Sequence, residues 1–270
     1  MSDTIDPATE YAGLLAAVVE AATAAGDRLM ADFSPAARPA SRADMAAGGR
    51  HLEELVLTQL RPELARLRPK AGWVDEDLET TPLPPGEWWL VDAVEGAVNY
   101  VHGLPEWAVT VTLLRDGRPV LAVVRQPAGD LTYTAVRGIG AYLNGRPLRT
   151  SAKTDLDAAI AATGQAEADQ RDTYRRIGQS ITALLGRALL VRTSVPSTFP
   201  MLAVAAGHGD LFWQYEPVLA GVAAGALLIT EAGGTVSRID GSAWGPGSPD
   251  ILAAAPGLHQ AAADVLAAVG

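Results

Sequence analysis

The 270-residue sequence contains no cysteine, and this absence removes several kinds of chemistry. Disulfide bonds, thiolate metal ligands and a cysteine nucleophile are all excluded. Basic side chains are also scarce, because 21 Lys and Arg stand against 31 Asp and Glu and leave a net charge of −10. Such a chain is poorly suited to neutralise the phosphates of a nucleic acid or to dock on an anionic membrane surface.

Long apolar runs are missing as well, so the sequence offers no segment that could span a bilayer. Its acidic first residues, MSDTIDPATEY, lack the charged-then-apolar pattern of a secretory signal. We therefore expect a cytoplasmic protein with no nucleic-acid and no membrane partner. With 49% hydrophobic residues, the chain has enough apolar material for one large domain or two small ones packed together.

Hydrophobic periodicity predicts two helices at the start of the chain. Apolar residues recur at helical spacing over about 7–33 and again over about 50–67, where Pro62 is expected to kink or split the helix. The segment 34–49 contains Pro, Ser and Gly and is interpreted as a loop.

Short apolar runs in the middle of the chain predict an antiparallel sheet. Asp116 and Gly117 lie between two of these runs and favour the positive φ angles of a type I′ hairpin turn. After about residue 150, helices and strands alternate, with strands expected at 188–191, 211–215 and 251–255. We expect an N-terminal α+β subdomain over 1–150, with two helices, the antiparallel sheet and the acidic motifs, and a C-terminal α/β subdomain over 151–270.

Acidic side chains gather in three places: Asp75-Glu76-Asp77, the stretch from Asp92 to Glu95, and Glu216. Two carboxylates three residues apart at the end of a strand can converge on one point, and hard cations such as Mg²⁺ prefer oxygen ligands of this kind. Gly96 permits a sharp turn into a helix, whose free N–H groups could hold a phosphate. On spacing alone, a solvated loop followed by an ordinary turn explains the same residues equally well.

Four segments taken together carry a more specific signal. They are Asp75-Glu76-Asp77, the run DAVEGAVNYVHG over 92–103, the run GAYLNG over 140–145, and Glu231-Ala232-Gly233-Gly234. In this combination the chain resembles the inositol monophosphatase family of Mg²⁺-dependent, Li⁺-sensitive phosphatases over almost its whole length. The resemblance implies a layered αβαβα sandwich, an architecture of mixed α+β and α/β character, and a homodimer.

The resemblance also implies roles for particular residues and exposes several departures. The implied metal ligands are Glu76, Asp92, Val94 and Glu95. Glu95 stands where the family has Asp, Ala97 where it has a Thr that helps to orient the metal-bound water, and Gly221 where it has a third metal-binding Asp. On the second helix, Gly48-Gly49 stands in place of a Thr-Asp pair that supports the same water.

Because these departures fall on the metal site, we expect no cofactor, with weak Mg²⁺ binding as the only exception. Carboxylates crowded together without a metal repel one another, so at least one should have a raised pKa. The main hypothesis is therefore an enzyme, though not a typical Mg²⁺-dependent inositol monophosphatase. It would be a repurposed, metal-independent acid/base enzyme of specialised metabolism, an isomerase, cyclase or lyase acting on a small molecule.

In that hypothesis the catalytic residues are Glu76, Asp77, Asp92 and Glu95. The substrate-binding candidates are Gly96, Ala97, His102, Arg192 and Glu216. Two alternatives stay open. One is a Mg²⁺-dependent phosphomonoesterase that acts on a sugar, inositol or nucleotide phosphate with a weakened site. The other is a non-catalytic pseudophosphatase that binds a small anion or a partner.

Overall fold

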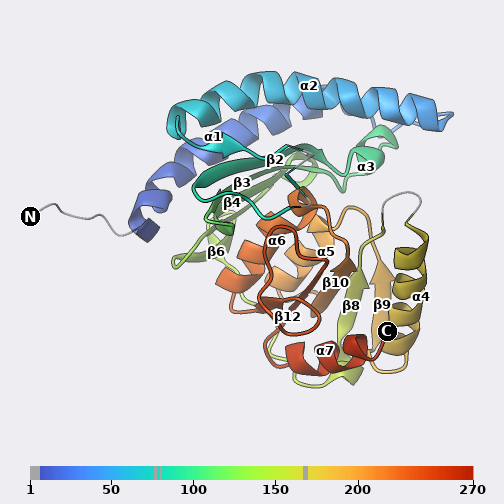
Figure 1. Ribbon diagram of the computed structural model, residues 1–270. Helices are drawn as coiled ribbons and strands as arrows, with labels where there is room; N and C mark the ends of the chain where they lie inside the picture. Colours follow the sequence, from blue (N-terminus) through green and yellow to red (C-terminus); the bar gives the residue numbers. More distant parts are fainter. Residues whose placement is uncertain (1–6, 76–77, 80, 167–169, 270) are drawn as a thin grey trace, which may run out of the picture.

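The computed structural model describes residues 7–75, 78–79, 81–166 and 170–269, which form five stacked layers (Figure 1). From one side to the other, the layers are the helix pair α1 (Pro7–Asp32) and α2 (Arg42–Leu67), a seven-stranded sheet, the helix pair α5 (Thr198–Ala205) and α6 (Leu219–Glu231), a five-stranded sheet, and the helix pair α4 (Arg171–Leu185) and α7 (His259–Ala267). This order confirms the expected αβαβα sandwich.

The larger sheet follows the chain, because strands adjacent in the sequence are also adjacent in the sheet. Its strands are β1 (Gly72–Trp73), β2 (Glu87–Glu95), β3 (Ala108–Arg115), β4 (Arg118–Gln126), β5 (Leu131–Val136), β6 (Gly140–Leu143) and β7 (Arg146–Pro147). All pairings are antiparallel except that of β1 with β2. Asp116 and Gly117 have φ angles of 49° and 73°, which confirms the positive-φ hairpin turn predicted between β3 and β4.

The smaller sheet mixes parallel and antiparallel pairs. In spatial order its strands are β11 (Thr235–Ser237), β12 (Asp250–Ala254), β10 (Leu211–Tyr215), β8 (Ile160–Thr163) and β9 (Leu190–Thr193). β8 runs parallel to both β10 and β9, and β12 runs antiparallel to its two neighbours. The remaining short elements are α3 (Ala97–Val101) and the 3₁₀ turns Pro127–Gly129 and Leu156–Ala158.

Two local predictions were wrong. The expected loop 34–49 ends early, because Ser41 accepts a hydrogen bond from the Asp44 N–H at 3.2 Å and caps a helix that begins at Arg42. Gly48 lies inside this helix, where an added Cβ would come 3.1 Å from the Val101 side chain, so close packing against α3 compensates for its poor helix propensity. The strand expected at 188–191 lies at 190–193, where it pairs with β8.

Helix α6 joins the two halves of the chain through packing. Most of its residues are buried, and its small side chains allow close contact with β4 of the larger sheet and with β12 of the smaller one. One core cluster accordingly combines Val124 of the larger sheet with Met201 and Leu228 from the later helices. The two sheets fall on either side of residue 150, but the division into two subdomains stays a prediction. No helix in the described part of the chain is both long and apolar enough to cross a membrane.

Candidate functional site

A cavity of about 230 Å³ lies where strand ends of both sheets meet the first turn of α6. Its lining comes from the end of β2, the segment after β8, the turn before α5, the end of β10 and the start of α6. The lining residues are Asp92, Glu95, Gln165, Val195, Pro196, Ser197, Gln214, Glu216, Val218 and Gly221. The chain thus brings together segments separated by more than 100 residues, and two of these segments supply three carboxylates.

Asp92 and Glu95 face the same cavity because β2 is irregular between them. Asp92 pairs with Thr110 and Glu95 with Ala108, so three steps along β2 correspond to two steps along β3. In a regular strand, side chains three residues apart point to opposite faces, and the extra residue of a bulge reverses this. The Val94 N–H donates a 3.0 Å hydrogen bond to the Asp92 Oδ1 and orients that carboxylate. The structure therefore confirms that the two carboxyl groups converge.

Glu95 is only 4% exposed, and its carboxyl group has an unusual pKa. Burial raises the pKa of Glu95 well above its ordinary value, and the charge of Asp92 and a hydrogen bond with Asp92 act in the same direction. The Thr198 N–H donates to the Glu95 Oε1 at 3.4 Å and opposes this rise only in part. The expected raised pKa among the clustered carboxylates is therefore confirmed, and Glu95 is the residue that has it.

The Asp92–Glu95 pair suits a hard divalent cation. It offers oxygen donors in contact with one another, and a cation would relieve the cost of ionising both carboxyl groups in a buried place. Glu76 and Asp77, two of the predicted site residues, lie outside the described residues. Within the described ranges, no group of three or more His, Asp or Glu side chains is placed to hold a metal. The described donors fit one cation through Asp92 and Glu95, and the part that Glu76 and Val94 play in binding it stays a prediction.

Gly221 faces the carboxyl group of Glu95 across open space. A Cβ added at Gly221 would lie 3.9 Å from both Glu95 carboxyl oxygens, with no closer neighbour. Thr198 makes hydrogen bonds to both residues, because its N–H donates to Glu95 and its hydroxyl donates to the Gly221 carbonyl at 2.9 Å. Position 221 is thus next to the carboxylate pair, but it brings no side-chain oxygen to it.

Gly96 and Ala97 begin α3 directly after the acidic pair. Gly96 has a φ of 87°, and a Cβ there would lie 2.7 Å from the Glu106 carbonyl oxygen, so no other residue fits this turn without displacement. Neither Gly96 nor Ala97 lines the cavity. Their predicted role in binding a substrate stays a prediction.

Two other predicted substrate residues lie away from the cavity wall. His102 ends α3, where its Nδ1 lies 2.7 Å from the Val98 carbonyl and its own carbonyl accepts a hydrogen bond from Arg38. These contacts stabilise the end of a helix. Arg192 is exposed on β9. Neither residue is among those that line the cavity, and their functional roles also stay predictions.

Glu216 does line the cavity and has a strained backbone. Its φ is 48°, an uncommon value for a non-glycine residue, and such outliers often occur at functional sites. Its Oε2 accepts a hydrogen bond from the Thr173 hydroxyl of α4 at 3.1 Å. Glu216 therefore adds a third carboxylate to the wall, held in place from the outer helix layer.

Three polar residues of the wall were not predicted from the sequence: Gln165, Ser197 and Gln214. The Ser197 hydroxyl donates to the Gln214 Oε1 at 2.6 Å, and the Gln214 Nε2 donates to the Gln165 carbonyl at 3.4 Å. Gln214 is the one that could have been found, because it is a polar residue in the otherwise apolar run LFWQY of β10. Gln165 and Ser197 lie outside the strands, and their sequence context gave no signal.

Comparison with known proteins gives a consistent result. The model of the inositol monophosphatase family matches residues 11–269. An inositol-1-monophosphatase of Rhizobium meliloti (strain 1021) is 34% identical over 236 residues, which cover 84% of this chain and 86% of the relative. A Nus factor SuhB of Pseudomonas aeruginosa is 38% identical over 158 residues, 57% of either chain. The structure of inositol monophosphatase from Anabaena (Nostoc) sp. PCC 7120 superposes with a TM-score of 0.82 at 26% identity, covering 97% of this chain and 98% of that one.

These matches overturn two expectations drawn from the sequence. The hypothesis of a metal-independent isomerase, cyclase or lyase was wrong, because the matching family model and the Rhizobium meliloti relative, which covers 84% of the chain, are both inositol monophosphatases. The expectation that no cofactor is needed was wrong for the same reason, since the resemblance to this family implies Mg²⁺. The sequence argument gave too much weight to the replaced side chains and too little to the carboxylate pair that remains in contact at Asp92 and Glu95.

Proposed function

Because the chain belongs to the inositol monophosphatase family, we propose that it is a Mg²⁺-dependent phosphomonoesterase that acts on a small phosphorylated alcohol. The observation that carries this proposal is the contact between Asp92 and the buried Glu95 in the wall of a cavity large enough for a small substrate. A sugar, inositol or nucleotide monophosphate is the substrate class that fits best.

Asp92 and Glu95 would hold the cation, and the resemblance adds Glu76 and the Val94 carbonyl. When bound, Mg²⁺ offsets the charge of the phosphate and lowers the pKa of a water molecule. The protein's own part begins with the Val94 N–H, which fixes the Asp92 carboxylate in position. Glu95 must lose its proton before it can bind a cation, so its raised pKa makes metal affinity increase with pH.

The rest of the wall supports an uncharged, hydroxyl-bearing leaving group. Ser197 and Gln214 are already hydrogen-bonded to each other, which leaves one N–H of the Gln214 amide for a substrate oxygen. No Lys or Arg is among the described residues of the lining. A second phosphate would therefore find no positive partner there, and we expect monophosphates to be preferred over bisphosphates.

The test is phosphate release from a panel of monophosphates in Mg²⁺, repeated in EDTA. We expect turnover only with the metal, and a loss of at least about 100-fold for Asp92→Asn, equivalent to about 2.7 kcal/mol of transition-state stabilisation. Asp157→Asn is the matched control, because Asp157 is an exposed aspartate outside the cavity. Equal activity of Asp92→Asn and Asp157→Asn would contradict the assignment of the site.

A binding role without turnover is the second candidate, favoured by one observation. Position 221 next to Glu95 brings no side-chain oxygen, so the site has fewer donors than its shape allows. The relative in Pseudomonas aeruginosa named as a Nus factor is a reminder that not every similar protein is named for phosphatase activity. Mg²⁺ binding by calorimetry without phosphate release from any substrate would favour this candidate. A homodimer and a cytoplasmic location remain predictions, which gel filtration and cell fractionation can test.

A further inference from the structure

A second recess lies beside the later turns of α6. It is a cleft of about 220 Å³ between the β3–β4 hairpin, the end of β5, helix α6 and the segment before β12. The residues that matter for its chemistry are Arg118, Arg137, Leu227, Thr230, Val236 and Trp244. Gly221 and Leu227 are six residues apart on α6, so the two recesses are about 9 Å apart along the helix axis. The cleft shares no lining residue with the acidic cavity.

Two guanidinium groups line the cleft, those of Arg118 and Arg137. Arg137 is half-buried, and its Nε donates a 2.9 Å hydrogen bond to the Pro119 carbonyl, which fixes the guanidinium plane. Among the residues that the structure describes, no carboxylate lies within ion-pair distance of Arg118 or Arg137. The negative charge that acts on Arg137 is that of Glu231, whose Oε1 accepts a hydrogen bond from the Gly138 N–H at 3.0 Å.

The positive charges reinforce each other within this cleft. Burial lowers the pKa of Arg137, the charge of Glu231 opposes this fall, and the neighbouring charge of Arg118 adds a smaller lowering effect. Both arginines remain charged at any physiological pH. In a chain with a net charge of −10, two adjacent cations without an ion-pair partner mark a place where an external anion would be stabilised.

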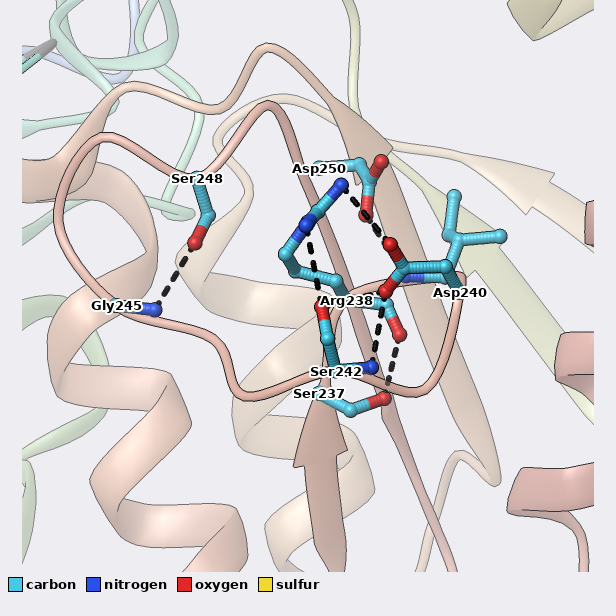
Figure 2. Close-up of polar contacts among 8 residues, drawn as sticks. Ser237, Arg238, Asp240, Ser242, Gly245, Ser248 and Asp250 are labelled. Carbon is cyan, nitrogen blue, oxygen red and sulfur yellow. Dashed lines mark hydrogen bonds and ion pairs between the residues drawn. The ribbon is translucent and has the colours of Figure 1, made fainter.

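The apolar wall of the cleft is built before any ligand arrives. Leu227 and Val236 supply aliphatic surface, and Trp244 packs against the same core cluster as α6. The segment that holds Trp244 is fixed by a network of polar contacts (Figure 2). The network includes the ion pair between Arg238 and Asp240 at 3.1 Å. It also includes three hydrogen bonds from backbone N–H groups: the Ser242 N–H donates to Asp240, the Gly245 N–H donates to Ser248, and the Ile239 N–H donates to Asp250.

We propose that this cleft binds a small organic anion whose carboxylate or phosphate group contacts Arg118 and Arg137 and whose apolar body lies against Trp244. Planar guanidinium groups pair with the oxygens of carboxylates and phosphates through two parallel hydrogen bonds. A cleft of about 220 Å³ suits a ligand with a single ring or a short chain. This inference does not depend on the proposed phosphatase activity.

Calorimetric titration of the full chain with benzoate, phenyl phosphate and benzyl alcohol tests the proposal. EDTA is included, because without a cation the carboxylates of the other cavity repel anions. We expect saturable binding of at least one of the two anions and none of the neutral alcohol. Arg118→Gln and Arg137→Gln should each weaken it at least about tenfold. Arg146→Gln, which changes an exposed arginine on β7 away from the cleft, should leave the affinity unchanged.

Several outcomes would overturn the inference. One is the absence of saturable binding of either anion, and another is binding that Arg118→Gln and Arg137→Gln leave intact. Inorganic phosphate that binds as tightly as phenyl phosphate would disprove the apolar contact with Trp244. Circular dichroism would show whether Arg137→Gln still folds, since Arg137 is half-buried. Arg118 is exposed, so Arg118→Gln tests the cleft even if Arg137→Gln does not fold.

Discussion

Helix α6 passes two recesses that differ in charge and in construction. Near its first turn, the cavity is lined by Asp92, Glu95 and Glu216, which come from strand ends far apart in the sequence. Near its last turns, the cleft is lined by Arg118 and Arg137, which come from neighbouring hairpins of one sheet. The helix itself contributes only small or apolar side chains and Thr230 to the two walls.

The comparison shows how little the net charge of −10 says about any one place in the molecule. In the acidic cavity, burial disfavours the charged form of a carboxyl group and so raises the pKa of Glu95. In the basic cleft, burial lowers the pKa of Arg137, but a guanidinium group titrates so far above neutrality that its charge is kept. The first recess therefore favours a cation or a proton, and the second an anion.

The largest effect on stability is expected at Gly96, next to the acidic pair, where the backbone leaves no room for a side chain. Gly96→Ala would place a Cβ 2.7 Å from the Glu106 carbonyl oxygen at a φ of 87°, and should lower the free energy of unfolding by about 3 kcal/mol. Gly117→Ala at the basic cleft is the matched control. Its φ is 73°, but the nearest atom would be 3.9 Å away, so only the backbone strain of about 1–2 kcal/mol applies. Urea unfolding would measure both, and equal losses would contradict the difference in packing.

A smaller and pH-dependent effect is expected for the buried acid. The folded-state pKa of Glu95 lies above its unfolded value, so the protonated form stabilises the fold. This contribution is complete below the ordinary glutamate pKa of about 4.3 and is lost as the pH rises through the raised value. In EDTA, Glu95→Gln should avoid this loss and become more stable relative to the unchanged protein as the pH increases.

The gain should be about 1.4 kcal/mol for each unit by which the pKa is raised. Unfolding free energies measured between pH 4 and pH 8 would test it, with Glu53→Gln as an exposed control on α2. If the difference in unfolding free energy between Glu95→Gln and the unchanged protein stays constant with pH, Glu95 is ionised throughout, contrary to its burial.

The smallest effects are expected from two glycines of α6. Gly225→Ala would bring a Cβ to 2.7 Å from the Met201 Cβ and should cost about 1 kcal/mol, because the higher helix propensity of alanine partly offsets the overpacking. Gly221→Ala meets nothing closer than 3.9 Å and should stabilise the helix by up to about 1 kcal/mol, because alanine has the higher helix propensity. Thermal unfolding would measure the change in melting temperature for each variant. A decrease for both would contradict the open space next to Glu95.

The sequence was informative where one local rule decided the outcome. The periodicity of 7–33 predicted α1, and Asp116-Gly117 predicted the hairpin, because both depend on neighbours along the chain. The start of α2 was missed, because two glycines within 34–49 suggested a loop while the cap at Ser41 and packing against Val101 favour a helix. Gln165 and Ser197 of the cavity were missed, since no local pattern indicates which loops will meet.

What the sequence by itself determined is the inventory of this protein and its local geometry. It determined the absence of thiol chemistry, the surplus of acids, the long helices and the motif that begins at Asp92 and contains Glu95. Only the tertiary structure decided that Glu95 is buried against Asp92, that Glu216 and Gln214 join them, and that two arginines meet beside Trp244. The physical reason is that burial, pKa and cavity shape depend on contacts between distant segments, and these exist only after the layers have packed.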